Sequence, residues 1–427
     1  MGIKPGLESI RELLSQLEHP ESGLRFVHVA GTNGKGSVCA LIESVLRTAG
    51  VRTGLFTSPH LVSMRERIRL AGELIGRQQV LAGLDRVKLA AERMARERGL
   101  SASFFEVTTA LAALAFREAG VDVVVWETGM GGRLDATNAV VPLVSVITTI
   151  ASDHTAYLGR RLVDIAREKA GIIKPGVPVV SGVGEPAARE VIEAAARSAG
   201  APWVQARHRY AIRCLEQDWT GQRLAVANSR WGRLAVRLPL LGAHQRCNLA
   251  VALAALEILA DRGLPIERDS LVHGLETVSW PGRLQVVSYR PRLVVDGAHN
   301  ATGMRCLRDA LRDLGTAQEL GAVFGVLRDK PAHRMMRTLL PLAARLDLVP
   351  VNSERSESPA RLADLAAQFG FGGEVHVHLT VADGLAAAAR WQAAAPAEQR
   401  MLLVAGSLYL VGEALAVRGW GEADDLP

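Results

Sequence analysis

Short apolar runs rich in β-branched residues alternate with longer helical patterns along nearly the whole chain. Such runs, bounded by loop residues, predict strands, the first five at Phe26–Ala30, Val51–Thr57, Val121–Glu127, Leu143–Thr149 and Val177–Ser181. The third run is almost continuously apolar, which is typical of a parallel strand covered by helices on both faces. This alternation predicts right-handed βαβ units and therefore an α/β, doubly wound N-terminal domain.

The pattern changes between residues 205 and 240. Three short runs separated by polar turns predict a small antiparallel β region at Ala211–Cys214, Arg223–Ala227 and Leu234–Leu238. A long helical pattern over residues 244–263 follows. We expect these segments to be additions to the first domain.

A second domain is predicted after the turn-rich segment Trp280–Arg283, where strand–helix alternation restarts. Its strands are expected at Arg292–Asp296, Ala322–Val326, Leu346–Val351 and Met401–Ala405. We therefore divide the chain into a first domain of residues 1–282 and a smaller, Rossmann-like α/β domain of residues 283–427.

Composition narrows the class of protein. The 427 residues are 48% hydrophobic and 22% charged, which suits two globular cores. The net charge is +6, but the basic residues are interspersed with acids, which favours small anionic substrates over a nucleic-acid partner. The four cysteines are widely spaced, so neither a disulfide scaffold nor a zinc ribbon is indicated. With no signal segment and no membrane-spanning stretch, we expect a cytoplasmic protein without a membrane partner.

The strongest chemical motif is the loop that follows the first predicted strand. It reads Gly31-Thr32-Asn33-Gly34-Lys35-Gly36-Ser37 and leads into a helical pattern at Val38–Ala49. Glycines let backbone amides turn toward a phosphate, the helix N-terminus adds its dipole, and Lys35 adds a positive charge. A purely structural glycine turn would not account for the lysine and serine within it. The loop therefore predicts binding of the phosphates of ATP.

One position departs from the usual phosphate-loop pattern, in which Ser or Thr follows the lysine and its hydroxyl binds magnesium. Here that position is Gly36. Magnesium still needs oxygen ligands, so another segment is expected to supply one. The candidate is Ser58, at the C-terminal end of the second strand, for which a turn or helix N-cap role is the alternative.

Polar side chains also follow two further strands. Glu127 ends an apolar run and precedes a glycine-rich loop, where a carboxylate can hold magnesium directly or through water. His154 lies on the loop after the next strand and is a candidate metal ligand, although a lone histidine is more often structural. Lys169, on the helical stretch that follows, reads from composition alone as a solvated residue.

Together these features resemble folylpolyglutamate synthase/dihydrofolate synthase, a branch of the Mur ligase superfamily. The matching stretches occur in the family's order from end to end of the chain, at residues 30–37, 57–61, 126–138, 152–154, 168–172, 244–248, 281–283, 296–300 and 406–409. The resemblance implies ATP and two magnesium ions as cofactors. It implies that Ser58 and Glu127 hold the first ion, that His154 faces the second, and that Lys169 carries a carbamate whose oxygen is a ligand.

The resemblance also implies how the nucleotide is held. Asn248 would lie near the adenine, and Arg283 would reach the phosphates from the hinge. Asp296 and His299 would close over the ribose and phosphates from the second domain. Lys35, His154, Lys169 and Arg283 are then the expected catalytic residues.

The substrate pocket is less defined by the sequence. Its candidates are Phe105, Arg133, Asp135 and Ser407, because an aromatic ring can stack on a pterin and an acid can pair with its guanidine-like edge. Core packing is the alternative for Phe105, and a solvated loop is the alternative for Asp135.

The implied reaction is an ATP-dependent ligation of L-glutamate to dihydropteroate or to the γ-carboxylate of a folyl-polyglutamate, through an acyl phosphate. We expect one monomeric chain to use both acceptors.

One alternative is another Mur-superfamily ligase with a different acceptor, such as a cell-wall precursor. Such ligases carry an extra N-terminal domain for the UDP-sugar, and the roughly 25 residues before the first strand are too few for one. The other is a non-catalytic ATP-binding module, which would not need Glu127, His154 and Lys169 together.

Overall fold

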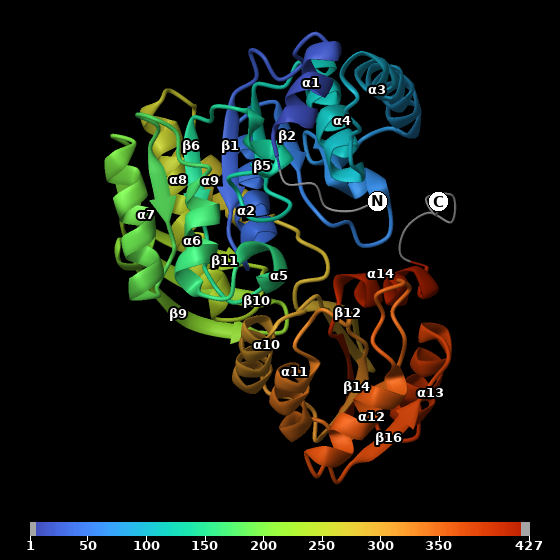
Figure 1. Cartoon of the computed structure of the whole chain (residues 1–427). Coiled ribbons are helices and arrows are strands. Elements are labelled where there is room, and N and C mark those ends of the chain that lie inside the picture. The colour runs from blue at the N-terminus through green and yellow to red at the C-terminus, as the bar shows by residue number, and fades with distance from the viewer. Residues whose placement is uncertain (1–5, 420–427) are drawn as a thin grey trace.

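The computed structural model describes residues 6–419 and is built around three sheets (Figure 1). The largest sheet has eight strands in the order β4-β3-β2-β5-β1-β6-β7-β8, and all of its pairings are parallel except β2–β3 and β3–β4. Its strands are β1 (Phe26–Ala30), β2 (Thr53–Phe56), β3 (Ile68–Leu70), β4 (Glu73–Leu74), β5 (Val123–Glu127), β6 (Val144–Ile147), β7 (Val179–Ser181) and β8 (Trp203–Gln205).

Helices cover both faces of this sheet because the side chains of its central strands alternate between two apolar cores. Val27 and Val29 of β1 join a core with one group of helices, whereas Phe26 joins a core on the opposite face. The first group is α2 (Lys35–Thr48), α8 (His244–Asp261) and α9 (Arg268–Glu276). The other face carries α1 (Glu8–Gln16), α3 (Arg77–Arg98), α4 (Phe104–Glu118), α6 (Leu162–Ala170) and α7 (Pro186–Ser198), with the one-turn α5 (Thr155–Leu158) preceding α6.

A three-stranded antiparallel sheet extends the first domain. It is formed by β9 (Ala211–Asp218), β10 (Gly221–Ser229) and β11 (Gly232–Leu238), and its apolar face joins the core of α2 and α8. At the β9–β10 turn, the ring of Trp219 lies 4.4 Å from the guanidinium carbon of Arg292, which belongs to the second domain. The small sheet therefore contacts both domains.

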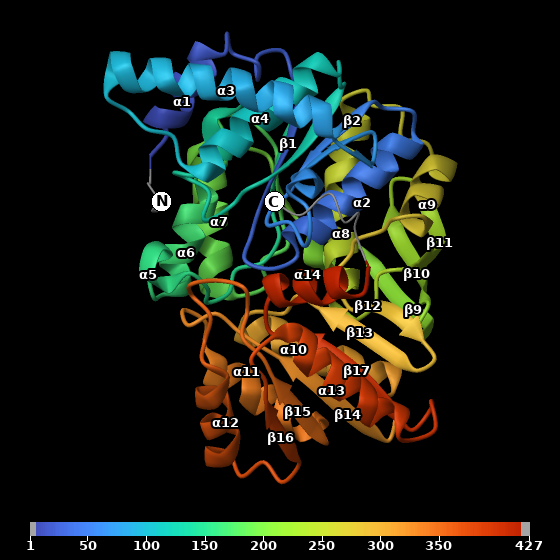
Figure 2. The ribbon, with the colours of Figure 1, turned by 90° about the vertical axis from the view of Figure 1, so that its right-hand side faces the viewer.

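The six-stranded sheet of the second domain has the order β12-β13-β17-β14-β15-β16, parallel except for the β12–β13 pair. The strands are β12 (Gln285–Tyr289), β13 (Arg292–Asp296), β14 (Glu319–Phe324), β15 (Arg345–Leu348), β16 (Glu374–Val377) and β17 (Arg400–Ala405). One face is covered by α10 (Ala301–Leu314), α11 (Ala332–Leu339) and α12 (Pro359–Gln368), and the other by α13 (Val381–Ala393) and α14 (Leu408–Val417). Figure 2 shows α14 at the boundary with the first domain.

The predicted α/β architecture is confirmed, including the added antiparallel region. The strands that the sequence did not predict are β3, β4, β8, β12 and β16, which all lie at or next to a sheet edge. Edge strands are short and partly polar, so they lack the apolar runs on which a strand prediction depends. The first helix of the loop motif begins at Lys35, three residues earlier than the sequence indicated.

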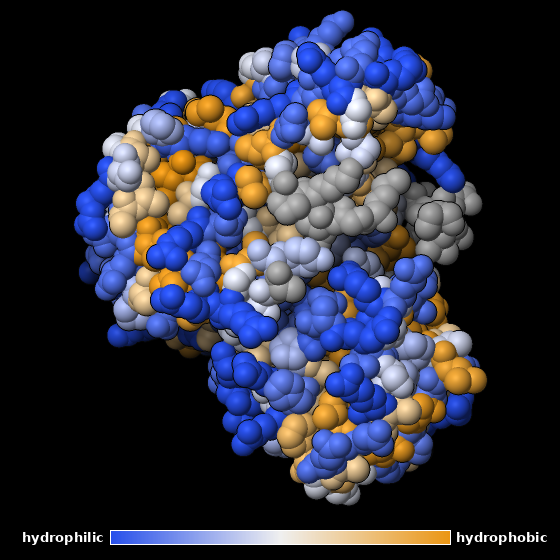
Figure 3. All heavy atoms as spheres, viewed as in Figure 1, coloured by the Kyte–Doolittle hydropathy of each residue, from blue (hydrophilic) through white to orange (hydrophobic). Residues whose placement is uncertain are grey.

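None of the helices within residues 6–419 is long and apolar enough to cross a membrane. Hydrophilic side chains predominate on the face seen in Figure 3, and the apolar ones are scattered among them.

Candidate active site

The conformation of the phosphate-binding loop is fixed by hydrogen bonds to Thr149, which follows β6. The Thr32 amide donates to the Thr149 carbonyl at 2.7 Å, and the Asn33 amide donates to Oγ1 of Thr149 at 3.1 Å. Gly34 takes a left-handed conformation with φ of +85° immediately before α2. A Cβ at this position would lie 2.4 Å from Oδ1 of Asn248, so only glycine lets the loop approach the start of α8 so closely.

The glycine in place of the usual hydroxyl residue has a steric cause. A Cβ at Gly36 would lie 2.6 Å from the indole ring of Trp280, just before the hinge between the domains. On the other side of the loop, Ser37 accepts a hydrogen bond from Gln245 at 3.4 Å, and Gln245 in turn accepts one from Asn248 at 2.8 Å. The sequence-predicted residues Ser37 and Asn248 therefore belong to one hydrogen-bonded group.

Glu127, at the end of β5, is 3% exposed and faces the loop. One of its carboxylate oxygens accepts the Ser58 amide at 3.0 Å, and the other lies 3.8 Å from Nζ of Lys35. Burial raises the pKa of Glu127 above its ordinary value, and the charge of Lys35 opposes this shift. The structure thus brings together Lys35, Ser58 and Glu127, which lie on three different strand ends.

Lys169 is buried, and the solvated reading of this residue is wrong. Its ammonium group donates to the Gly31 carbonyl at 2.8 Å, which fixes α6 beneath the phosphate loop. Burial, and next the positive charge of Lys35, lower the pKa of Lys169 to about 7. A substantial fraction of this amine is therefore uncharged at neutral pH.

Asp153 is a contact between the domains that sequence reasoning did not single out. Its carboxylate accepts Nζ of Lys330 at 2.6 Å and Nδ2 of Asn300 at 3.1 Å, and it lies 3.5 Å from Nε2 of His299. Burial works to raise the pKa of Asp153, but the hydrogen bond from His299 and the charge of Lys330 hold it well below its usual range. Lys330 follows β14 on a strand-end loop, which was the available signal for it.

His154 directly follows this acid and takes a left-handed backbone conformation, with φ of +49°. Such a conformation is uncommon for a residue other than glycine and is often found at functional sites. Burial, and next the charge of Lys330, lower the pKa of His154 to about 4. The ring is therefore neutral at pH 7 and has a nitrogen lone pair available for a ligand.

Arg283 and Asp296 both contact the loop that follows β13. A Cβ at Gly297 would lie 2.4 Å from Nη1 of Arg283, so the guanidinium packs over the loop after β13. Asp296 accepts the amides of Leu284 and Ala298 at 2.7 and 2.8 Å, which ties this loop to the hinge. Asp296 thus has a positioning role in this arrangement, while Arg283 and His299 face the first domain.

The four substrate candidates are engaged in local structure. Asp135 accepts amides of Met130 and Thr137, and Ser407 caps α14 by accepting the Tyr409 amide. Arg133 is more than half exposed and pairs with Glu168, with Nη2 and Oε1 2.8 Å apart.

Phe105 packs against Gly129 and lies 5.9 Å from the ring of Phe56. Its neighbour Phe104 is the exposed member of the pair, at 52%.

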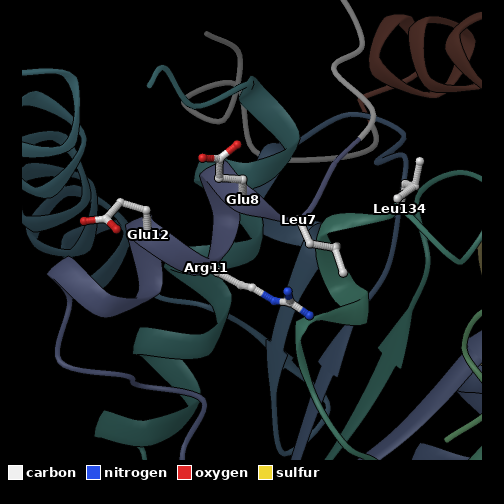
Figure 4. A pocket seen from close by; sticks show the side chains of 5 residues that line it. All are labelled: Leu7, Glu8, Arg11, Glu12 and Leu134. Carbon is white, nitrogen blue, oxygen red and sulfur yellow. The ribbon is translucent and has the colours of Figure 1, made fainter. Parts of the chain in front are cut away.

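A pocket of about 560 Å³ lies in the first domain, between α1 and Leu134 of the glycine-rich loop (Figure 4). It is lined by Leu7, Glu8, Arg11, Glu12 and Leu134. Leu7 and Arg11 extend to the same side of α1, whereas Glu12 extends to the opposite side. Leu134 adjoins Asp135, so the pocket lies next to the predicted acceptor segment rather than at the phosphate loop.

The oxygen atoms of Glu127 and Ser58 suit a magnesium ion that is also bound by phosphate oxygens. No group of three or more His, Cys, Asp or Glu side chains within residues 6–419 could hold a metal ion by itself. The Glu127 carboxylate is nevertheless buried and only partly neutralised, and it lies beside Ser58, whose hydroxyl has no hydrogen-bond partner among these residues. Such a site suits an ion that takes its remaining oxygens from a nucleotide.

Family models match both parts of the chain. The "Mur ligase middle domain" matches residues 29–256, and the "Mur ligase, glutamate ligase domain" matches residues 282–408. The chain is 37% identical to the dihydrofolate synthase/folylpolyglutamate synthase of Bacillus subtilis over 365 residues, which is 85% of either chain. The chain belongs to the dihydrofolate synthase/folylpolyglutamate synthase branch of the Mur ligase family. As in that family, its activity is that of an ATP-dependent glutamate ligase.

Solved structures of family members superpose closely on the chain. A folylpolyglutamate synthase from Mycobacterium tuberculosis, complexed with ADP and AMPPCP, gives a TM-score of 0.89 at 32% identity and covers 97% of this chain and 96% of its own. Escherichia coli FolC in complex with DHPP and ADP gives a TM-score of 0.85 at 31% identity, covering 98% and 94%. The mixed eight-stranded and six-stranded sheets are therefore the fold of this family.

Proposed function

We propose that this chain adds L-glutamate both to dihydropteroate and to the γ-carboxylate of folyl-polyglutamates. The observation that carries the proposal is the meeting of two strand-end surfaces at one site: Lys35 and Glu127 from the first sheet, and His299 and Lys330 from the second. The Mur ligase family supplies the reaction class, and the E. coli relative that binds DHPP and ADP supports a pteridine acceptor.

The chain's own residues suit transfer of a phosphoryl group to a carboxylate. The amides of residues 34–37, at the start of α2, would orient the β- and γ-phosphates, and Lys35 would offset charge on the transferring group. Arg283 would add a second positive charge from the hinge. With Lys330 and His299 closed onto Asp153, water would be excluded from the acyl phosphate while the amine of glutamate attacks it.

The acceptor ring would occupy the pocket beside Leu134. Its lining of two leucines, one arginine and two glutamates is suited to a flat heterocycle that carries polar edges. The incoming glutamate would approach from the second domain, whose Lys330 and His299 border the site through their contacts with Asp153.

Magnesium, when bound, would neutralise phosphate charge, with Glu127 and Ser58 as its ligands and His154 at a second ion.

We also propose a carbamate on Lys169, formed by its uncharged amine and carbon dioxide. Because the pKa of Lys169 is lowered to about 7, the reactive amine becomes more abundant as pH rises through 7. Carbon-13 NMR of protein in labelled bicarbonate should show a carbamate signal that is stronger at pH 8 than at pH 6 and absent in K169A. A spectrum identical in wild type and K169A would exclude this modification.

The dual-acceptor proposal is tested by an acceptor screen with ATP and glutamate, read by mass spectrometry. We expect glutamylated products from dihydropteroate and from a reduced folyl monoglutamate, and none from a UDP-muramyl peptide. Product from only one pteridine would refute dual use. Product from the muramyl peptide alone would instead favour another acceptor class in the Mur ligase family.

A further inference from the structure

Arg67 is a buried cation at the boundary between the two domains. It ends the short 3-10 helix Met64–Arg67, directly before β3, and is 7% exposed. Its Nε donates to Nδ1 of His60 at 2.9 Å, and its guanidinium carbon lies 5.3 Å from the centroid of the exposed Phe104 ring. The guanidinium is thus held in place by a neutral imidazole and an aromatic face.

In the part of the chain that the structure describes, no carboxylate pairs with this guanidinium at close range. Within residues 6–419, no Asp or Glu oxygen lies within 4.0 Å of Arg67. The adjacent Glu66 is fully used by the amides of Leu61, Val62 and Ser63. Burial lowers the pKa of Arg67, and the nearby Tyr409, Glu127 and Glu66 offset only part of this effect. A buried charge without a counter-ion is costly, so such an arginine is suited to binding an anion.

The position of Arg67 indicates where that anion would lie. Tyr409, which is 40% exposed, is on α14 of the second domain and influences Arg67 electrostatically, as does Glu127 at the phosphate site. Leu61 packs against α14, so the segment that leads from His60 to Arg67 lies at the boundary between the domains. Arg67 therefore lies near Glu127 of the phosphate site, where the first domain meets α14.

We propose that Arg67 binds the α-carboxylate of the terminal glutamyl residue of the folyl acceptor. This inference rests on the proposed function and adds a residue that distinguishes its two acceptors. A folyl acceptor ends in two carboxylates separated by a short aliphatic spacer, and only the γ-carboxylate reacts. With the γ-carboxylate at Lys35 and Glu127, the α-carboxylate needs its own cation nearby, and a guanidinium can bind it through two parallel hydrogen bonds.

Dihydropteroate has no such second carboxylate, because its only carboxylate is the one that reacts. Arg67 is therefore a determinant of acceptor choice rather than of phosphoryl transfer. The exposed ring of Phe104 beside the guanidinium would contact the acceptor's aromatic part on the same face. The incoming glutamate also has an α-carboxylate, but in the proposed function it approaches from the second domain.

The test compares the two acceptors within one enzyme. For R67Q and R67K, we expect the ratio of kcat/KM for folyl monoglutamate to that for dihydropteroate to fall about 10- to 100-fold, which is the effect of losing a bidentate charged hydrogen bond. The loss should appear mainly as a higher KM for the folyl acceptor. R67K keeps the charge without the planar fork, so a similar fall in both variants would show that the bidentate geometry is needed and not the charge alone. R69Q, two residues along β3, is the matched control, because Arg69 bonds only the Gly72 carbonyl.

A folyl monoglutamate amidated at the α-carboxylate gives an independent measurement. Wild type should bind it about 10- to 100-fold more weakly than the free acid, whereas R67Q should bind both equally. An unchanged acceptor ratio in R67Q, with thermal unfolding like that of wild type, would overturn the proposal. A rise in KM for glutamate with both acceptors would assign Arg67 to the incoming amino acid instead. Failure of wild type to use a folyl acceptor would contradict the proposed function, a result distinct from either.

Discussion

At the scale of single residues, His28 shows how burial couples the fold to pH. It lies in the middle of β1 with no exposed surface, its Nε2 contacts Oγ1 of Thr137 at 2.9 Å, and its Nδ1 has no partner. Burial, and next the charge of Lys174, lower the pKa of His28 to about 3. The folded protein therefore holds this ring neutral over the whole physiological range.

This environment predicts a specific loss of stability in acid. Below pH 6.5 the unfolded chain binds a proton at His28 that the folded chain does not bind until about pH 3, so the folded state loses stability as pH falls between these values. Between pH 7 and pH 5 the loss should be about 2 kcal/mol from this residue. Urea unfolding at both pH values should show a smaller difference for H28Q than for wild type. Equal differences in the two proteins would contradict the assignment.

Residue roles were predicted from the sequence only where a strand end or a glycine marked them. Glu127 was identified because it directly follows an apolar strand, and its burial next to Lys35 agrees with that reasoning. Lys169 was not marked in this way, because a helical pattern does not reveal which polar side chain another loop will cover. Lys330 does follow a strand end, but its partner could not be predicted, since its contact with Asp153 joins residues 177 positions apart.

At the scale of elements, the phosphate loop is shaped by the hinge as much as by its own glycines. Gly36 is required because Trp280 occupies the space of a side chain. G36S should therefore lower kcat/KM for ATP by about two orders of magnitude, as expected for a small displacement of catalytic groups. The hydroxyl that it adds at the usual magnesium position should not compensate.

The companion variant G36A separates the clash of the added Cβ from the effect of the added hydroxyl. It adds the same Cβ without a hydroxyl, so steady-state kinetics should show it impaired to a similar degree, and W280A should restore part of the activity in both backgrounds. An active G36S beside an inactive G36A would mean that the hydroxyl at this position is a metal ligand after all.

The elements that could be predicted are those whose apolar pattern is complete. The central strands β1, β5 and β17 are buried on both faces, and their runs were found nearly residue for residue. The edge strand β16 is largely exposed and alternates charged, histidine and valine residues, so its sequence carries no strand signal of comparable strength.

At the scale of the whole molecule, the approach of the two domains depends on a glycine. A Cβ at Gly412 of α14 would lie 1.8 Å from the carbonyl oxygen of Leu61 in the first domain. Alanine favours a helix over glycine by roughly 0.5–1 kcal/mol, so α14 alone would be stabilised by G412A. We nevertheless expect kcat to fall at least about tenfold, because the domains can no longer meet closely.

Small-angle scattering with ATP bound should show a larger radius of gyration for G412A than for wild type. The matched control is G372A in the second domain, where an added Cβ meets no atom within 4 Å. Full activity in G412A would show that the contact between Leu61 and α14 is not needed for catalysis.

The turn at Trp219 has a mechanical consequence. The chain crosses from one domain to the other once, near residue 282, and the tip of the β9–β10 hairpin meets Arg292 at a second place. Two fixed points define a line, so rotation about that line is the motion that keeps both in place. Contacts away from it, such as Asp153 with Lys330 and Leu61 with Gly412, would then separate in a single swing. The small sheet would then be the second fixed point of this rotation, and product could leave while the two domains keep their alignment along the line.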